Sequence, residues 1–285
     1  MITQSTGAII NIILDPILIF GLFGMPKMGV AGAAIATVTG QICAAILAIT
    51  FNLTKNPDVH ICFKGFKPQI IFVKNILSVG IPSIIMSSVG SAMTFGMNKI
   101  LITFSSTAVA VFGVYFKLNS FVFMPVFGLN NGMVPIVSYN YGAQNKKRLT
   151  KTIKLAIMYA VCIMFIGIML FQFIPDVLLR LFDASDHMLE IGIPALRVIS
   201  LSFAFAGICI VISSSLQALG HGFLSMMISI TRQLIILLPS AYILAKFGGI
   251  HAVWWSFNIA EIASLTLSLL FFKHMYNKII KHLGE

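Results

Sequence analysis

Eight long, nearly uncharged apolar stretches constrain this 285-residue chain more than any other feature of its sequence. A helix needs about 20 mostly apolar residues to cross the hydrocarbon core of a bilayer. The stretches that meet this length are 2–24, 29–53, 76–104, 107–139, 153–174, 190–217, 223–247 and 250–272. Only 9% of the residues are charged, against about 25% in a globular protein. The sequence therefore predicts an all-α, polytopic membrane protein whose main partner is the lipid bilayer.

The net charge of +11 arises largely in short connections between the apolar stretches. Basic residues gather in 55–74, 146–154 and 273–281, whereas four of the eight acidic residues lie in 176–190. Because basic loops stay on the cytoplasmic side, we expect both ends of this chain in the cytoplasm and a location in the plasma (inner) membrane. The same distribution argues against nucleic-acid binding. The first residues lack a basic region and a small-residue cleavage site, so no signal peptide is expected.

The first apolar stretch carries an ionisable residue, Asp15, beside polar Asn11 and Pro16. A carboxylate in the middle of a bilayer costs roughly 2.5–3.5 kcal/mol, so such residues usually face a cavity or an ion path. Asn11 and Asp15 are four residues apart and share one helix face. Pro16 cannot donate a backbone hydrogen bond, which predicts a helix kink beside the acid. This turn is a candidate site for Na⁺ or a proton, because hard cations prefer oxygen ligands.

The second stretch begins with small residues, GVAGAAIAT at 29–37, which predict close packing against a neighbouring helix. Thr37 adds a hydroxyl there. The pattern N-x-x-x-D-P followed by GVAGAAIATVTGQ resembles helices five and six of the multidrug and toxic compound extrusion (MATE) transporters. In part of that family the counterparts of Asn11, Asp15 and Thr37 help bind a coupling Na⁺ or proton, together with an acid on helix one. No counterpart of that acid is visible in this sequence.

The resemblance extends along the rest of the chain. It is carried by LSVGIPS, NKILITFSSTAVAVFGVYFKL, FMPVFGLNNGMVPIVSYNYGAQNKKR and QALGHGFLSMMISITRQLIILLP. MATE transporters have twelve helices in two six-helix lobes, so the chain resembles helices five to twelve. The resemblance implies three parts: residues 1–53 as the last two helices of the amino-terminal lobe, 54–75 as a basic cytoplasmic linker, and 76–285 as the carboxy-terminal lobe with its tail. Met1 would then be an internal methionine or a truncated start.

A weak internal repeat agrees with this division. Pro16 precedes GVAGAAIATVTGQ at 29–41, and Pro239 precedes GIHAVWWSFNIAE at 249–261. The repeat pairs the first two spans with the last two, as in transporters built from repeated halves. It also pairs Gln41 with Glu261, and both are candidates for facing a substrate cavity, although a solvated position at the interface would explain Glu261 equally well.

Two cationic residues inside apolar stretches are further candidates for a cavity. Lys117 lies in the fourth span, and Arg232 lies beside Gln233 in the seventh. Long lysine stems also reach the membrane interface from within a span, and Arg232 could serve lobe packing. Methionine and phenylalanine are abundant, 15 and 24 residues, and such side chains suit binding of varied apolar cations.

Signatures of enzymes and nucleotide-driven pumps are missing from the sequence. There is no P-loop, G-x-S-x-G or H-E-x-x-H motif. The four cysteines have neither metal-ligand nor disulfide spacing. We therefore expect no enzymatic activity, no ATP site in this chain and no cofactor beyond a coupling ion.

These features predict a secondary active transporter that expels amphipathic organic cations in exchange for Na⁺ or H⁺. Two other functions stay open. A lipid-linked oligosaccharide flippase of the same superfamily would line a larger cavity with several cations for the pyrophosphate. A fragment that does not transport is the other, because four helices of the family's twelve have no counterpart here.

Overall fold

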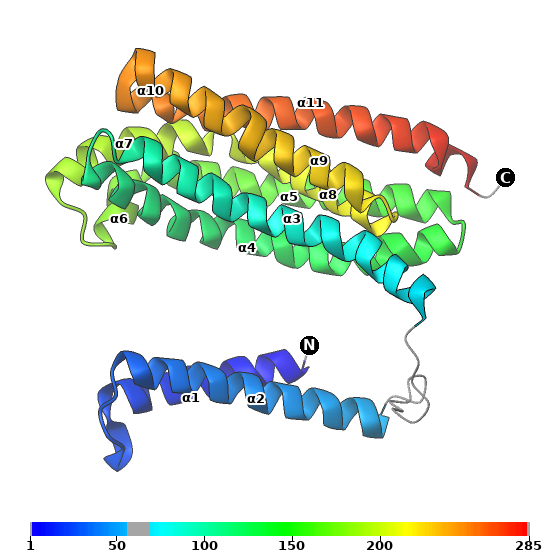
Figure 1. Ribbon diagram of the computed structural model, residues 1–285, viewed down its shortest axis with the longest axis horizontal. Helices are drawn as coiled ribbons and strands as arrows, with labels where there is room; N and C mark the ends of the chain where they lie inside the picture. The colour runs from blue at the N-terminus through cyan, green and yellow to red at the C-terminus, as the bar shows by residue number, and fades with distance from the viewer. Residues whose placement is uncertain (1, 56–68, 284–285) are drawn as a thin grey trace. The chain divides into compact units, whose positions relative to one another are not determined.

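The computed structural model describes residues 2–55 and 69–283, and that part of the chain folds into helices joined by short turns (Figure 1). It separates into two compact units, residues 1–69 and 70–285. The boundary lies inside the linker predicted at 54–75. Most of that linker, residues 56–68, lies outside the described residues.

By length and composition, the described residues contain up to eight candidate membrane spans, when one bent pair of helices counts as a single span. Seven described helical segments are long and apolar enough to cross a bilayer, with Gly222–Val253 counted as one continuous segment. The pair Asp186–Ser200 and Phe203–Ala218 passes the same test together. The predicted all-α, polytopic architecture is thus confirmed. Large apolar side chains cover the outer helix faces, including exposed Phe121 and Phe165, as expected for surfaces that contact lipid.

The first unit is a hairpin of α1 (Ile2–Phe20) and α2 (Val30–Lys55), joined by the short helix η1 (Leu22–Gly24). Glycines bring the two helices close. A Cβ atom on Gly32 would lie 2.5 Å from the carbonyl oxygen of Leu18, and one on Gly40 would lie 2.7 Å from that of Gly7. The close packing predicted from the small residues of 29–37 therefore occurs, and α1 supplies the partner backbone.

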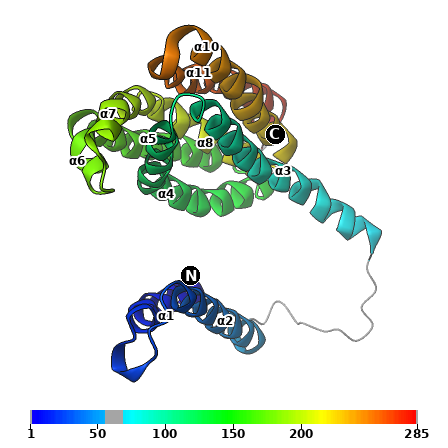
Figure 2. The same cartoon turned by 60° about the vertical axis from the view of Figure 1, so that its left-hand side comes forward.

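The second unit contains the remaining elements. They are α3 (Ile70–Leu101), α4 (Ser106–Gly142), α5 (Lys146–Phe173), α6 (Pro175–Arg180), α7 (Asp186–Ser200), α8 (Phe203–Ala218), α9 (Gly222–Ile230), the π-helix η2 (Thr231–Leu237), α10 (Leu238–Val253), α11 (Trp255–Lys278) and η3 (Ile280–His282). Helices α9 and α10 lie alongside α3 in both ribbon views (Figures 1 and 2). The core between these helices is aromatic at its centre, where the buried rings of Phe112, Tyr115 and Phe257 contact one another.

Several boundaries differ from the sequence-based ones. The fourth span was expected to end at residue 139, yet α4 runs through Pro125 and Pro135 to Gly142. A proline removes only its own N–H from the helix ladder, and packed neighbours stabilise the rest of a membrane helix. Helix α5 begins at Lys146, seven residues early, because the Asn145 side chain accepts a hydrogen bond from the Arg148 backbone N–H at 3.0 Å.

The sixth span is bent by 50° between α7 and α8. The hydroxyl of Ser202 donates to the carbonyl of Ile199 at 2.7 Å, and Ser200 donates to that of Arg197 at 2.9 Å. Such local bonds compete with the helix ladder. Gln172 of α5 donates to the Arg197 carbonyl at 2.8 Å and to the Ser200 hydroxyl at 3.1 Å. A side chain from another helix thus satisfies the polar groups at the break.

Both hairpins related by the sequence repeat turn at a glycine with positive φ. Gly29 (φ 54°) precedes α2, and Gly249 (φ 67°) lies near the end of α10, just before α11. In this conformation a side chain is strained, so glycine is favoured. The repeat is therefore visible in the backbone as well as in the letters of the sequence.

Candidate functional site

Polar side chains of the first unit meet where α1 and α2 pack closely. The Asn11 amide Nδ2 lies 3.3 Å from the Thr37 hydroxyl oxygen and 3.5 Å from Asp15 Oδ1. The Thr37 hydroxyl donates to the Ala33 carbonyl at 3.0 Å, so its oxygen is left to accept. The three residues singled out in the sequence are thus neighbours, on two helices.

The glycines of the hairpin explain why these side chains reach each other. A Cβ atom on Gly40 would come within 3.3 Å of the Asn11 Cβ, so a larger residue there would push the helices apart. Asn11 and Asp15 are half-buried and Thr37 is exposed. Pro16 follows directly, inside a helix that continues to Phe20. Gln41 is exposed on α2, and the cavity described next is built entirely by the second unit.

The second unit contains an open cavity of about 1020 Å³, formed by α3, α4, α8, α9, η2 and α11. Aromatic side chains supply much of its wall, among them Tyr115, Phe116, Phe123, Phe127 and Phe257. Within the described residues, Arg232 and Glu261 are the two charged side chains that line it. The cavity is therefore largely apolar with one pair of opposite charges, a composition typical of small-molecule sites.

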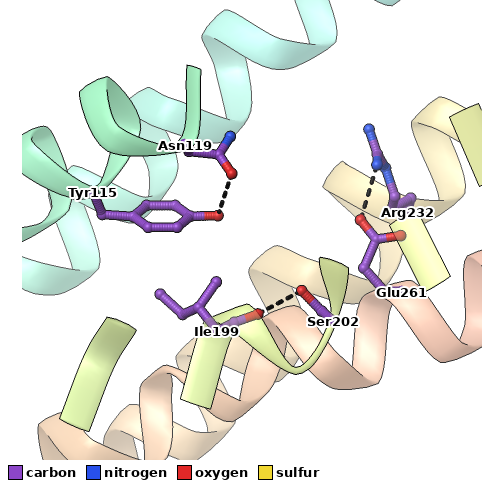
Figure 3. Close-up of polar contacts among 6 residues, drawn as sticks. All are labelled: Tyr115, Asn119, Ile199, Ser202, Arg232 and Glu261. Carbon is purple, nitrogen blue, oxygen red and sulfur yellow. Dashed lines mark hydrogen bonds and ion pairs between the residues drawn. The ribbon is translucent and has the colours of Figure 1, made fainter. Parts of the chain in front are cut away.

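Arg232 of η2 and Glu261 of α11 form an ion pair in this cavity (Figure 3). Arg232 Nη1 donates to Glu261 Oε1 at 2.9 Å, and the side chains are 25% and 12% exposed. The second oxygen, Oε2, is buried and has no hydrogen-bond partner among the described residues. A buried acceptor without a partner costs about 1–3 kcal/mol, and more when it is charged. The carboxylate is thus only half satisfied by the protein.

The position of Arg232 depends on the π-helix. Residues 231–237 make wider turns than the α-helices on either side, and Gln233 in the same segment also lines the cavity. Short π segments are often found at functional sites. Sequence reasoning selected Arg232 and Glu261 but gave no indication that they would face each other.

Polar residues not selected from the sequence complete the wall. Tyr115 donates its hydroxyl hydrogen to Asn119 Oδ1 at 3.5 Å (Figure 3). Gln217 donates to the Ser225 hydroxyl at 2.8 Å, and that hydroxyl also contacts Ser213. Gln217 begins the stretch QALGHG, which carried part of the family resemblance, so it was within reach of sequence reasoning.

Lys117 does not line the cavity. It is exposed on α4, and its ammonium lies 5.6 Å from the centre of the Phe182 ring. Two residues earlier on the same helix, Tyr115 faces the cavity. Residues two apart on a helix point in different directions, which explains why Lys117 does not line this cavity. Within the described residues there is also no cluster of three or more histidine, cysteine or acidic side chains able to hold a metal ion.

Comparisons with known proteins place these features in one family. The MatE family model matches residues 82–243. The multidrug export protein MepA of Staphylococcus haemolyticus is 29% identical over 98% of this chain and 60% of its own length. MepA of Staphylococcus aureus strain MSSA476 is 32% identical over 92% of this chain and 56% of its own. The chain therefore spans well under two thirds of these relatives.

Solved structures show the same fold. A crystal structure of MATE in complex with MaL6 matches with a TM-score of 0.87 at 26% identity, covering 98% of this chain and 63% of that one. A MOP superfamily transporter from Pyrococcus furiosus matches with a TM-score of 0.87 at 25% identity, covering 100% and 63%. With the family model matching more than half of its residues, the chain belongs to the MatE family of membrane transporters.

Proposed function

We propose that the chain forms all or part of a secondary active transporter, which exports small amphipathic organic cations across the plasma (inner) membrane in exchange for Na⁺ or H⁺. The multidrug export named for its relatives supports this class of activity. The observation that carries the substrate class is the half-satisfied carboxylate of Glu261 inside an aromatic cavity. A cation placed there gains both a charge partner and apolar contact.

In this proposal the Glu261 carboxylate attracts the positive end of the substrate into the cavity. Aromatic rings such as Phe116 and Phe123 contact its apolar part. Arg232 holds Oε1 and keeps the empty cavity electrically neutral. A flippase for lipid-linked pyrophosphates would instead need several cations in the cavity, whereas Arg232 is the single cationic residue lining it among those described, and it is already paired. The cavity therefore favours cations over pyrophosphates.

The coupling ion is assigned to the α1–α2 contact. Carboxylate, amide and hydroxyl oxygens of Asp15, Asn11 and Thr37 supply the ligand type that Na⁺ prefers, and Asp15 alone suffices for a proton. Binding there changes the charge beside Pro16, where the helix lacks one backbone hydrogen bond. In the mechanism we propose, that change reshapes α1 and favours release of substrate to the outside.

Ligand binding tests the substrate assignment without requiring transport. Ethidium is a planar cation whose fluorescence rises on leaving water, so its affinity for the purified full chain can be measured directly. Glu261→Gln is expected to weaken binding about tenfold, which corresponds to about 1.4 kcal/mol and lies within the range for an unmade buried hydrogen bond. Glu190→Gln, at a side chain that is 76% exposed, is the matched control. Equal affinity in both variants would contradict the assignment.

Transport is tested separately in proteoliposomes. The chain is reconstituted, loaded with ethidium, and given a Na⁺ or proton gradient. Gradient-dependent release is expected, with a loss in Asp15→Asn. Binding of ethidium without any gradient-dependent release would favour the second candidate, a lobe that binds substrate but does not transport by itself. That candidate follows from the partial coverage of the relatives.

A further inference from the structure

A second cavity lies at the end of the second unit where α3 starts, α9 starts and α11 ends. It measures about 360 Å³, and its lining includes His221, His274 and Lys278. These side chains come from the α8–α9 turn and from the last turns of α11. No acidic side chain lines it among the described residues. We propose that this cavity binds the phosphate group of an anionic phospholipid from the adjacent leaflet.

The electrostatics of the whole end support an anionic ligand. Lys146 of α5 donates to the Lys281 carbonyl at 2.7 Å, which places the α4–α5 turn beside the carboxy-terminal tail. Basic residues at this end are Lys146, Lys147, Arg148, Lys151, Lys273, Lys278 and Lys281. Every described acidic residue of the second unit lies elsewhere: four in 176–190 at the opposite end of α5, and Glu261 within the span of α11. Among the described residues, no acidic side chain at this end compensates the positive potential.

The chemistry of the cavity fits a phosphate group. Lys278 supplies a full charge, and the two imidazoles supply N–H donors for phosphate oxygens. Glycines flank His221 at positions 220 and 222, and Gly222, the first residue of α9, is buried. The His221 side chain does not cap that helix, so its first N–H groups add to the attraction for an anion.

The depth of the cavity favours a lipid over a dissolved anion. The starts of α3 and α9 and the end of α11 are the ends of predicted membrane spans, and basic pockets at that level bind lipid head groups. Phe223, beside the cavity, is exposed and offers a surface for an acyl chain. The site is distinct from the Arg232–Glu261 cavity, so this inference does not depend on the proposed transport function.

Native mass spectrometry of the full chain in neutral detergent tests the inference. Phosphatidylglycerol and phosphatidylcholine both carry a phosphodiester, but only the first is anionic overall, so we expect preferential retention of phosphatidylglycerol. Lys278→Gln should weaken phosphatidylglycerol binding about fivefold, because each basic residue near an anionic lipid surface contributes about 1 kcal/mol to binding. The triple variant His221→Gln, His274→Gln, Lys278→Gln should lose the preference. Lys246→Gln, an exposed residue of α10 outside the cavity, should keep it.

Two results would overturn the inference. Equal phosphatidylglycerol binding by the triple variant and the unmodified chain, with equal unfolding temperatures in lipid-free detergent, would remove the site. Displacement of the lipid by millimolar inorganic phosphate would show that the cavity takes free phosphate and would overturn the lipid assignment. No displacement by phosphate, together with loss of binding in the triple variant, supports the lipid.

Discussion

The Arg232–Glu261 pair allows a quantitative test of how strongly the carboxy-terminal helices depend on one buried interaction. Replacing Arg232 with glutamine leaves Glu261 charged, 12% exposed and with neither oxygen paired to a cation. Removing one partner of a buried pair typically costs about 3–5 kcal/mol. The double variant Arg232→Gln, Glu261→Gln has no buried charge, and its two amides can bond each other. It should therefore recover about 2 kcal/mol or more of that loss.

The assay is reversible unfolding of the full chain in mixed micelles, measured for both single variants and the double variant. The four free energies of unfolding give the coupling energy between the residues. An exposed ion pair yields about 0.2–1 kcal/mol, so we expect more than 1 kcal/mol here. Arg232→Lys keeps the charge but loses the planar guanidinium. Its free energy of unfolding should lie between those of the unmodified chain and Arg232→Gln. Additive single effects would refute the reasoning, because they would mean that the two charges are solvated independently.

Three further predictions follow from individual positions. Gly32→Leu should destabilise the α1–α2 hairpin by about 1–3 kcal/mol, since any Cβ at this position meets the Leu18 carbonyl. Ala34→Leu, at an exposed position of the same helix, should leave the hairpin's stability unchanged, and unfolding temperatures distinguish the two variants. Asp15→Asn should abolish gradient-dependent ethidium release while leaving the affinity for ethidium within about twofold of that of the unmodified chain. Asp176→Asn, at an exposed position, is the control. Retained release in Asp15→Asn would contradict the coupling role of Asp15. Lys117→Gln should leave ethidium affinity unchanged, because that ammonium lies over Phe182 outside the cavity, and a clear loss of affinity would contradict this placement.

The number and type of the membrane spans could be predicted because they depend on local composition. Twenty apolar residues in a bilayer form a helix whatever surrounds them, since every backbone group must be satisfied within the segment. The proximity of Asn11, Asp15 and Thr37 was also within reach. Asn11 and Asp15 are one helix turn apart, and the glycines of the next helix, which carries Thr37, allow the two helix backbones to pack closely.

Features set by contacts between distant segments were not predictable. The bend after Ser200 contains neither proline nor glycine at its centre, and it is stabilised by Gln172, 28 residues earlier. The facing of Arg232 and Glu261 depends on how η2 packs against α11, 29 residues later. Lys117 was misplaced for a related reason: hydropathy locates a residue along a span but not around its circumference.

The π-helix also has an evolutionary consequence. Each residue added to or removed from a helix rotates everything beyond it by about 100°. Deleting one residue within 233–237 would let the segment relax to an α-helix. If the residues after the deletion kept their packing, Arg232 would rotate about the helix axis and turn away from Glu261. A descendant sequence that lost the wide turn would leave Glu261 without its charge partner unless a new partner arose or both charges were replaced together. The extra residue is therefore expected to be retained wherever the Arg232–Glu261 pair is retained.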